Sequence, residues 1–310
     1  MTTMDGTEDA YAIAERIAAL GAWETAERYN WAIKLSGVAY PYFCTAFQTG
    51  EDKCHRLCMI EGWDTFHNCV LRRHDPDFGV YTSWLEFPHF EMAARPDGRI
   101  ELRHAKPGYV MREVDGNEKK TIGRLLWQCY GVLMKMESDP SAATKFADQN
   151  AMFGRLETSP GAWEDHPFVI QPPRRYVEEI ALPNDLLAKA RDMPIDQNET
   201  AELDFRLVED EIFADCELEP RLCYRLSMAL APTGRKIMRE RLAVDENNSI
   251  KQLWESVPRR VLACLVERGR IPGTICVGSM RMFRFMRPLG MELPFKLSLK
   301  QSLPAVRKMH

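Results

Sequence analysis

The chain has 310 residues, of which 45% are hydrophobic, 28% charged and 10% aromatic. This composition excludes an intrinsically disordered chain, and the 18 glycines and 19 prolines are too few for a collagen-like or low-complexity chain. The length is about twice that of a usual domain, so we expect two domains.

Charge is distributed unevenly around the formal net charge of -4. Residues 1–175 hold 20 Lys and Arg against 25 Asp and Glu, residues 176–220 hold 3 against 14, and residues 221–310 hold 18 against 6. We therefore predict an α+β domain over 1–175, an acidic connecting segment over 176–220 and a smaller, basic α/β domain over 221–310.

Hydrophobic periodicity predicts the elements of the first domain. Apolar residues at helical spacing predict a helix or helix pair over 10–35, and period-two residues over 40–109 predict an antiparallel sheet with a hairpin turn at Asp97-Gly98. A helix over 119–136 carries an apolar face that should cover this sheet. The remainder is rich in turn residues, and Pro172-Pro173 is the predicted boundary because it cannot continue a helix or inner strand.

The basic domain has a clearer order of elements. An acidic helix (182–193) and a strand-like bridge (203–213) precede two strands around the turn at 232–234. The expected elements that follow are a helical region interrupted near Pro258 (249–269), a buried strand (273–278), a helix capped by Ser279 and ending near Phe285, a strand (292–298) and a final helix (303–309). This order predicts an α/β layer in which the last two strands are a parallel pair.

The segments RLSMALAPTG (225–234), RIPGTICVG (270–278), RPLGMEL (287–293) and SLPAVRKM (302–309) resemble the carboxy-terminal domain of a bacterial two-domain family of unknown function. Members of this family pair it with an amino-terminal domain similar to the region from YNWAIKL (29–35) to GVLMKM (131–136). The resemblance implies a two-domain architecture and assigns no catalytic residues.

The order of elements in the basic domain is also similar to a shortened ribonuclease-H-like fold, whose enzymes hold two Mg2+ ions with carboxylates, one of them on the first strand. If residues 222–231 are that first strand, it contains no Asp or Glu, and the two later strands offer only Glu292. Since Mg2+ requires oxygen ligands, these positions argue against a two-metal nuclease. The chain also lacks G-x-S-x-G and both glycine-rich phosphate-loop patterns, so we lean against an enzyme and expect no cofactor.

Cysteine and histidine gather in residues 44–104, which hold five of the seven histidines and four of the nine cysteines. The candidate zinc ligands are Cys54, His55, Cys58, His67 and Cys69. Their spacing argues against zinc, because Cys54 and Cys58 lie about 13 Å apart along one predicted strand while His55 points to its other face. We therefore predict no metal site and assign the cysteines to the core.

Gly278 and Ser279 lie between a predicted buried strand and a helix. At the carboxyl end of a parallel strand, free helix N–H groups and a nearby arginine could hold an anion, although Ser279 alternatively only caps its helix. The candidate anion- or nucleic-acid-binding residues are Gly278, Ser279, Arg281, Arg284, Arg287, Arg259 and Arg260.

The basic domain has two interpretations. Its arginines either form an open surface for nucleic acid or are neutralised by the acidic segment 176–220, and we favour neutralisation. The amino terminus lacks the pattern of a secretory signal and no long apolar run occurs, so we expect a cytoplasmic protein without membrane contact. The sequence favours a non-catalytic interaction or regulatory protein with an unidentified protein partner; the alternative is a nucleic-acid-binding protein with a degenerate nuclease-like carboxy-terminal domain.

Overall fold

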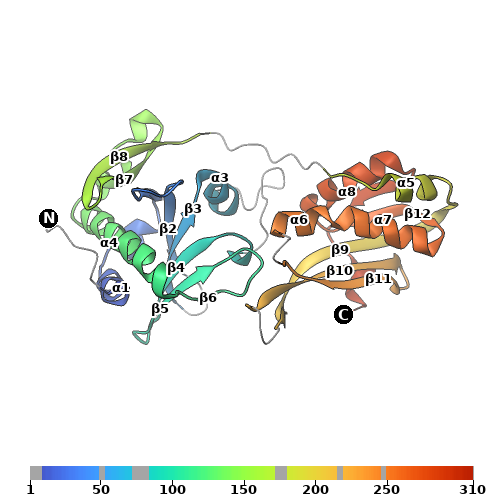
Figure 1. The fold of residues 1–310 in the computed structure, drawn as a ribbon, viewed down its shortest axis with the longest axis horizontal. Coiled ribbons are helices and arrows are strands. Elements are labelled where there is room, and N and C mark those ends of the chain that lie inside the picture. Colours follow the sequence, from blue (N-terminus) through green and yellow to red (C-terminus); the bar gives the residue numbers. More distant parts are fainter. Residues whose placement is uncertain are drawn as a thin grey trace. The chain divides into compact units, whose positions relative to one another are not determined.

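A computed structural model describes residues 9–48, 53–71, 84–171, 180–214, 219–245 and 249–309. The chain divides into two units, each built on its own sheet (Figure 1). The amino-terminal unit comprises Met1–Leu71, Phe87–Lys106 and Met111–Arg174, and the carboxy-terminal unit comprises Arg72–Glu86, Pro107–Val110 and Arg175–His310. The predicted fold class, α+β followed by α/β, is confirmed. The predicted Pro172-Pro173 boundary lies outside the described residues.

The amino-terminal unit contains an eight-stranded sheet in the order β6-β5-β4-β3-β2-β1-β7-β8. Its strands are β1 (Trp31–Lys34), β2 (Tyr42–Gln48), β3 (His55–Glu61), β4 (His89–Ala94), β5 (Ile100–Ala105), β6 (Arg112–Glu113), β7 (Ala151–Ser159) and β8 (Ala162–Val169). All neighbours are antiparallel except β1 and β7. The antiparallel sheet and its hairpin at Gly98, where φ is +83°, are confirmed. The end of the predicted first helix is instead β1, and the turn-rich remainder contains β7 and β8.

Helices cover one face of this sheet. They are α1 (Ala10–Ala18), α2 (Trp23–Ala26) and α4 (Gly116–Ser138), with the short α3 (Trp63–Phe66), the π-helix η1 (His67–Leu71) and the 3-10 turns η3 (Pro140–Thr144) and η4 (Ala147–Gln149) elsewhere in the unit. α4 begins at a capping box formed by Asp115 and Glu118, and it lies beside α1 in Figure 1. The apolar faces of α1 and α4 pack against the sheet in one core, as the periodicity over 119–136 predicted.

The carboxy-terminal unit contains a five-stranded sheet in the order β11-β10-β9-β12-β13. Its strands are β9 (Ile195–Phe213), β10 (Arg221–Ala231), β11 (Arg235–Leu242), β12 (Ile271–Val277) and β13 (Lys296–Leu299). β9, β10 and β11 are antiparallel, whereas β12 is parallel to both β9 and β13, so the predicted parallel pair is confirmed. The acidic stretch 176–220, predicted as a connecting segment, contributes the central strand β9.

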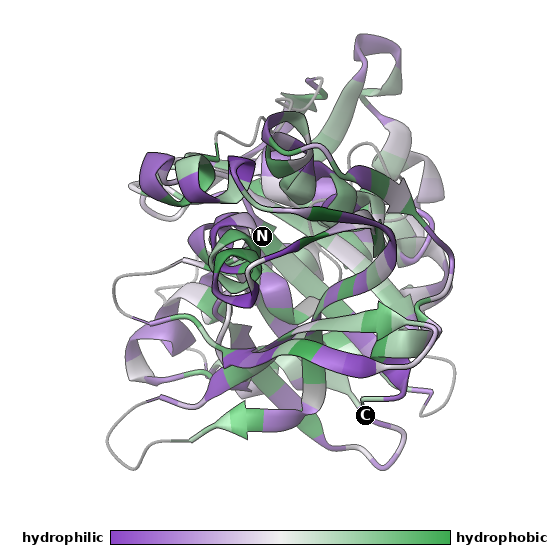
Figure 2. Cartoon of the chain, turned by 90° about the vertical axis from the view of Figure 1, so that its right-hand side faces the viewer, coloured by the Kyte–Doolittle hydropathy of each residue, from purple (hydrophilic) through white to green (hydrophobic). Residues whose placement is uncertain are grey.

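Two helical layers enclose this sheet. The helices are α5 (Asn184–Arg191), α6 (Ile250–Glu255), α7 (Val257–Arg268), α8 (Met280–Glu292) and α9 (Pro304–Arg307), with the 3-10 turn η2 (Trp84–Glu86). α5 to α8 share a core with Ala201, Leu203 and Phe205 of β9, and α9 packs on the other face with Ala229 and Cys276. Hydrophilic and hydrophobic residues accordingly alternate along the elements in Figure 2.

α8 continues through Pro288 to Glu292, beyond the predicted end near Phe285. None of the described helices combines the length and apolar character needed to cross a membrane.

Candidate anion-binding site

A cavity of about 270 Å3 lies at the carboxyl ends of the parallel strands in the carboxy-terminal unit. The chain leaves β12 through Gly278 and Ser279 to enter α8, and it leaves β13 through Gln301 and Ser302 towards α9. The cavity is lined by Asp204, Phe205, Arg206, Trp254, Gly278, Ser279, Gln301, Ser302, Leu303, Val306 and Arg307. Two residues of the sequence prediction, Gly278 and Ser279, therefore line one cavity. This edge of a parallel sheet is where α/β folds bind ligands.

Ser279 caps α8, as the sequence predicted. Its backbone is extended, and its hydroxyl accepts a hydrogen bond from the Met282 amide at 3.1 Å. Other first-turn N–H groups of a helix have no partner within the helix, and the helix dipole places partial positive charge at this end. The thirteen-residue α8 thus directs an anion-attracting terminus towards the cavity.

Two arginines add full positive charge to the cavity lining. Arg206 and Arg307 are both exposed, and Arg206 lies on β9 while Arg307 ends α9. Among the described residues, Asp204 is the one acidic residue of the lining, and its Oδ2 atom is 3.8 Å from Nε of Arg206. The lining side chains therefore carry a net positive charge, and Ser279, Gln301 and Ser302 add neutral hydrogen-bonding groups.

Acidic residues of β9 correct the expectation that the first strand of this sheet lacks carboxylates. The first strand of the sheet is β9, not residues 222–231, and β9 carries the carboxylates Glu202 and Asp204 on the face towards α9. Glu202 is buried, and its Oε2 accepts hydrogen bonds from the amides of Ala305 at 2.6 Å and Val306 at 3.2 Å. Glu202 thus caps α9, and Asp204 remains as the one acid lining the cavity, whereas two-metal hydrolysis requires several.

The pKa of Asp204 is raised above 3.8 because burial penalises its charged form, while Arg206, the Phe205 amide and Arg307 oppose the shift. A carboxyl whose pKa is higher in the folded than in the unfolded state destabilises the fold when ionised, and this penalty disappears below the unfolded value. Asp204→Asn is therefore expected to raise the melting temperature at neutral pH. We expect the difference from the parent protein to vanish below about pH 3.8 in thermal unfolding followed by circular dichroism.

Glu199→Gln is a control for which we expect the opposite change in melting temperature. The hydrogen bond from Arg268 lowers the pKa of Glu199 below 4.5, so the ionised group stabilises the fold above that value and loses this contribution as the pH falls. This variant should have a lower melting temperature at neutral pH. If Asp204→Asn also lowers it there, the assigned environment of Asp204 is wrong.

The predicted arginines do not gather at this cavity. Arg281 is buried, with Nη1 at 3.2 Å from Oε2 of the buried Glu86. Arg260 pairs with Glu240 at 2.8 Å, Arg284 is half-buried, and Arg259 and Arg287 are exposed. Arg281, a predicted anion-binding residue, is therefore buried in an ion pair and is not at the surface.

The acidic segment does pair with arginines of the basic domain. Glu199 contacts Arg268 and Arg270, and Glu211 contacts Arg225 and Arg241. Two glutamates of 176–220 thus contact four arginines of 221–310 and offset half of their charge. The cavity arginines Arg206 and Arg307 were not among the predicted site residues, although the alternating pattern of Glu202, Asp204 and Arg206 is visible in the sequence.

Two of the zinc candidates, His55 and His67, contact aromatic rings. His55 stacks on Trp23 with 4.8 Å between ring centroids, and His67 contacts Trp63 edge-on. Within the described ranges, one group of at least three ligand-type side chains lies close together, and it combines Cys58 with His89 and Glu91.

Comparison of the chain with protein-family models, with curated proteins and with solved structures finds no match in any of the three.

Proposed function

We propose that the protein is a non-catalytic binding protein whose carboxy-terminal unit holds a phosphate-bearing strand of nucleic acid at the cavity beyond β12. The observation that carries the proposal is the convergence of the α8 amino terminus, Arg206 and Arg307 on one cavity of about 270 Å3. A phosphate diester carries the charge that a helix terminus and two arginines attract, and hydroxyl and amide groups can hold its sugar and phosphate oxygens.

The element order of the unit supports the choice of nucleic acid. With β9 as the first strand, three antiparallel strands are followed by helices and two parallel strands, which completes the ribonuclease-H-like order that the sequence resembles. The absence of a second carboxylate from the cavity lining supports binding without cleavage. A domain with the element order of a nuclease that binds a nucleic-acid strand at this cavity, but lacks metal ligands, would have both this element order and this cavity lining.

The test is fluorescence anisotropy of a labelled single-stranded oligonucleotide with the full-length protein over a range of salt concentrations. On a single strand, each phosphate contact contributes a slope of about -0.7 in the logarithm of affinity against that of salt concentration, or about fivefold in affinity at 0.1 M salt relative to 1 M. We expect the double variant Arg206→Gln/Arg307→Gln to bind roughly 25-fold more weakly at 0.1 M salt and to reduce the slope by about 1.4.

The matched control is Arg259→Gln, which removes an exposed arginine of α7 that does not line the cavity. Its affinity is expected to stay within about twofold of the parent value, since long-range attraction between exposed charges is screened. The proposal is wrong if the parent protein does not bind at low salt, or if Arg259→Gln weakens binding as much as the double variant. Cleavage of the oligonucleotide on adding Mg2+ would contradict the non-catalytic assignment.

A further inference from the structure

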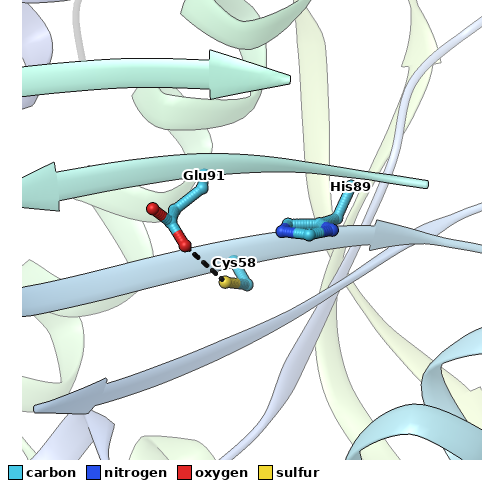
Figure 3. A group of neighbouring side chains, drawn as sticks. All are labelled: Cys58, His89 and Glu91. Carbon is cyan, nitrogen blue, oxygen red and sulfur yellow. Dashed lines mark hydrogen bonds between the residues drawn. The ribbon is translucent and has the colours of Figure 1, made fainter. Parts of the chain in front are cut away.

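A buried group of ligand-type side chains lies in the amino-terminal unit. Cys58 on β3 is directly opposite Glu91 on β4, and His89 lies two residues before Glu91 on the same face (Figure 3). Their neighbours Leu57, Met59, Phe90 and Met92 alternate with them and belong to the core beneath α4. Cys58, His89 and Glu91 therefore face the other side of the sheet, where all three are at most 4% exposed.

The distances within this group suit a small cation. One sulfur, one nitrogen and one oxygen ligand atom all lie within 4.8 Å of one another, and Cys58 Sγ is 3.9 Å from Oε2 of Glu91. Around tetrahedral zinc, with bonds of about 2.3 Å to sulfur and about 2.0 Å to oxygen, the sulfur and oxygen ligands are about 3.5 Å apart. A contraction of a few tenths of an ångström between Cys58 and Glu91 therefore reaches ligand geometry.

The surrounding groups orient two of the ligands. The Nδ1 atom of His89 lies 3.1 Å from the Phe87 carbonyl, to which it donates a hydrogen bond, so the lone pair of the neutral ring is on Nε2. Arg56 Nη1 binds Oε1 of Glu91 at 2.8 Å, while Oε2 is directed at Cys58. Metal-binding histidines and carboxylates have such supporting hydrogen bonds.

We propose that Cys58, His89 and Glu91 bind one zinc ion between β3 and β4. On binding, the Cys58 thiol releases its proton to solvent and its sulfur bonds to zinc, together with Nε2 of His89 and Oε2 of Glu91. Three protein ligands leave the fourth tetrahedral position to water or another small ligand. The sequence spacing predicted no metal because only cysteines and histidines of residues 54–69 were weighed together. The pairing of β3 with β4 supplies two ligands more than 30 residues away from Cys58.

Cobalt titration of the full-length, chelator-treated and reduced protein tests this site, because Co2+ occupies zinc sites and a thiolate ligand gives it a charge-transfer absorption. We expect one equivalent of Co2+ to produce that absorption and one equivalent of Zn2+ to abolish it. Cys58→Ser is expected to lose the absorption, and His89→Gln to weaken Co2+ binding by at least about 100-fold.

Cys44→Ser is the matched control, since Cys44 is equally buried on the neighbouring strand β2 but faces α4, 3.8 Å from Cys129. It should keep the cobalt absorption. X-ray absorption at the zinc edge of the parent protein needs no variant and should report one sulfur at about 2.3 Å with nitrogen and oxygen at about 2.0–2.1 Å. The proposal is overturned if the parent shows no thiolate-to-cobalt absorption, if Cys58→Ser retains it, or if the zinc spectrum contains no sulfur.

Discussion

Glu86→Gln is expected to destabilise the carboxy-terminal unit by about 3–5 kcal/mol, the largest effect that we expect from a single change of charge. The carboxylate of Glu86 is fully buried, and Oε2 accepts from Nη1 of Arg281 at 3.2 Å. The guanidinium also lies over the Trp254 ring, with its carbon 3.5 Å from the ring centroid. Glutamine has the shape of glutamate without its charge, so the variant leaves the buried charge of Arg281 without this counterion.

The double variant Glu86→Gln/Arg281→Met separates the effect of the buried charge on stability from the effect of side-chain packing. Replacing a buried ion pair by uncharged groups of similar volume is often neutral or stabilising, so we expect it to recover at least half of the loss. The exposed pair of Arg191 and Glu292 is the control, and Glu292→Gln should cost less than about 1 kcal/mol.

Urea unfolding of the full-length protein measures these differences, and hydrogen exchange of the α8 amides assigns them to this unit. The structural role of Arg281 is refuted if Glu86→Gln changes stability no more than Glu292→Gln does. It is equally refuted if the double variant is less stable than Glu86→Gln alone.

Helix geometry explains why Arg281, one of the predicted anion-binding residues, is buried while Arg287 is exposed. Three residues turn a helix by about 300°, so Arg281, Arg284 and Arg287 spread over about 120° of the α8 surface instead of sharing one line. Arg281 consequently lies on the buried side and Arg287 on the exposed side. Its partner Glu86 is 195 residues away in the sequence, and no local pattern connects the two.

Elements with strong local signals were predictable, and those defined by distant pairing were not. The sequence predicted α4, which has a capping box and an apolar face. It also predicted the junction from β12 to α8, where a buried strand is followed by a serine cap. β9 was predicted only as a bridge because its acidic residues dominate its composition. Its alternate residues Ala201, Leu203 and Phe205 are buried on one face, which places an acidic strand at the centre of a sheet.

The same contrast holds for the two candidate sites. Gly278 and Ser279 were predicted from one strand-to-helix junction, whereas Asp204 and Arg206 line the cavity because β9 lies beside β12. In the other unit, Cys58 was weighed only with the cysteines and histidines of residues 54–69. Its structural neighbour Glu91 follows from the register of β3 with β4, which the spacing of cysteines and histidines does not encode.

Gly154→Ala is expected to destabilise the amino-terminal unit by about 3 kcal/mol. Gly154 lies on β7 between β1 and β8, opposite Ala32 and His166. A Cβ atom at this position would lie 2.4 Å from two ring carbons of Phe168 and 2.5 Å from the carbonyl oxygen of Ala32. The ring could rotate away, but the carbonyl is part of the backbone of β1, so relief of the clash must displace the β1–β7 pairing.

Gly131→Ala is the matched control, because Gly131 lies within α4 and a Cβ atom there meets nothing within 4 Å. Alanine favours a helix over glycine by about 0.8–1 kcal/mol, so this variant should be as stable as the parent or more so. Thermal unfolding of the full-length proteins gives the order of stability, and faster hydrogen exchange of β1 and β7 amides in Gly154→Ala locates the loss. Gly154→Ala could instead unfold at the same temperature as the parent, with unchanged hydrogen exchange in β1 and β7. In that case the two strands are not packed as closely as the structure has them, and the parallel pairing that joins β7 and β8 to the rest of the sheet is wrong.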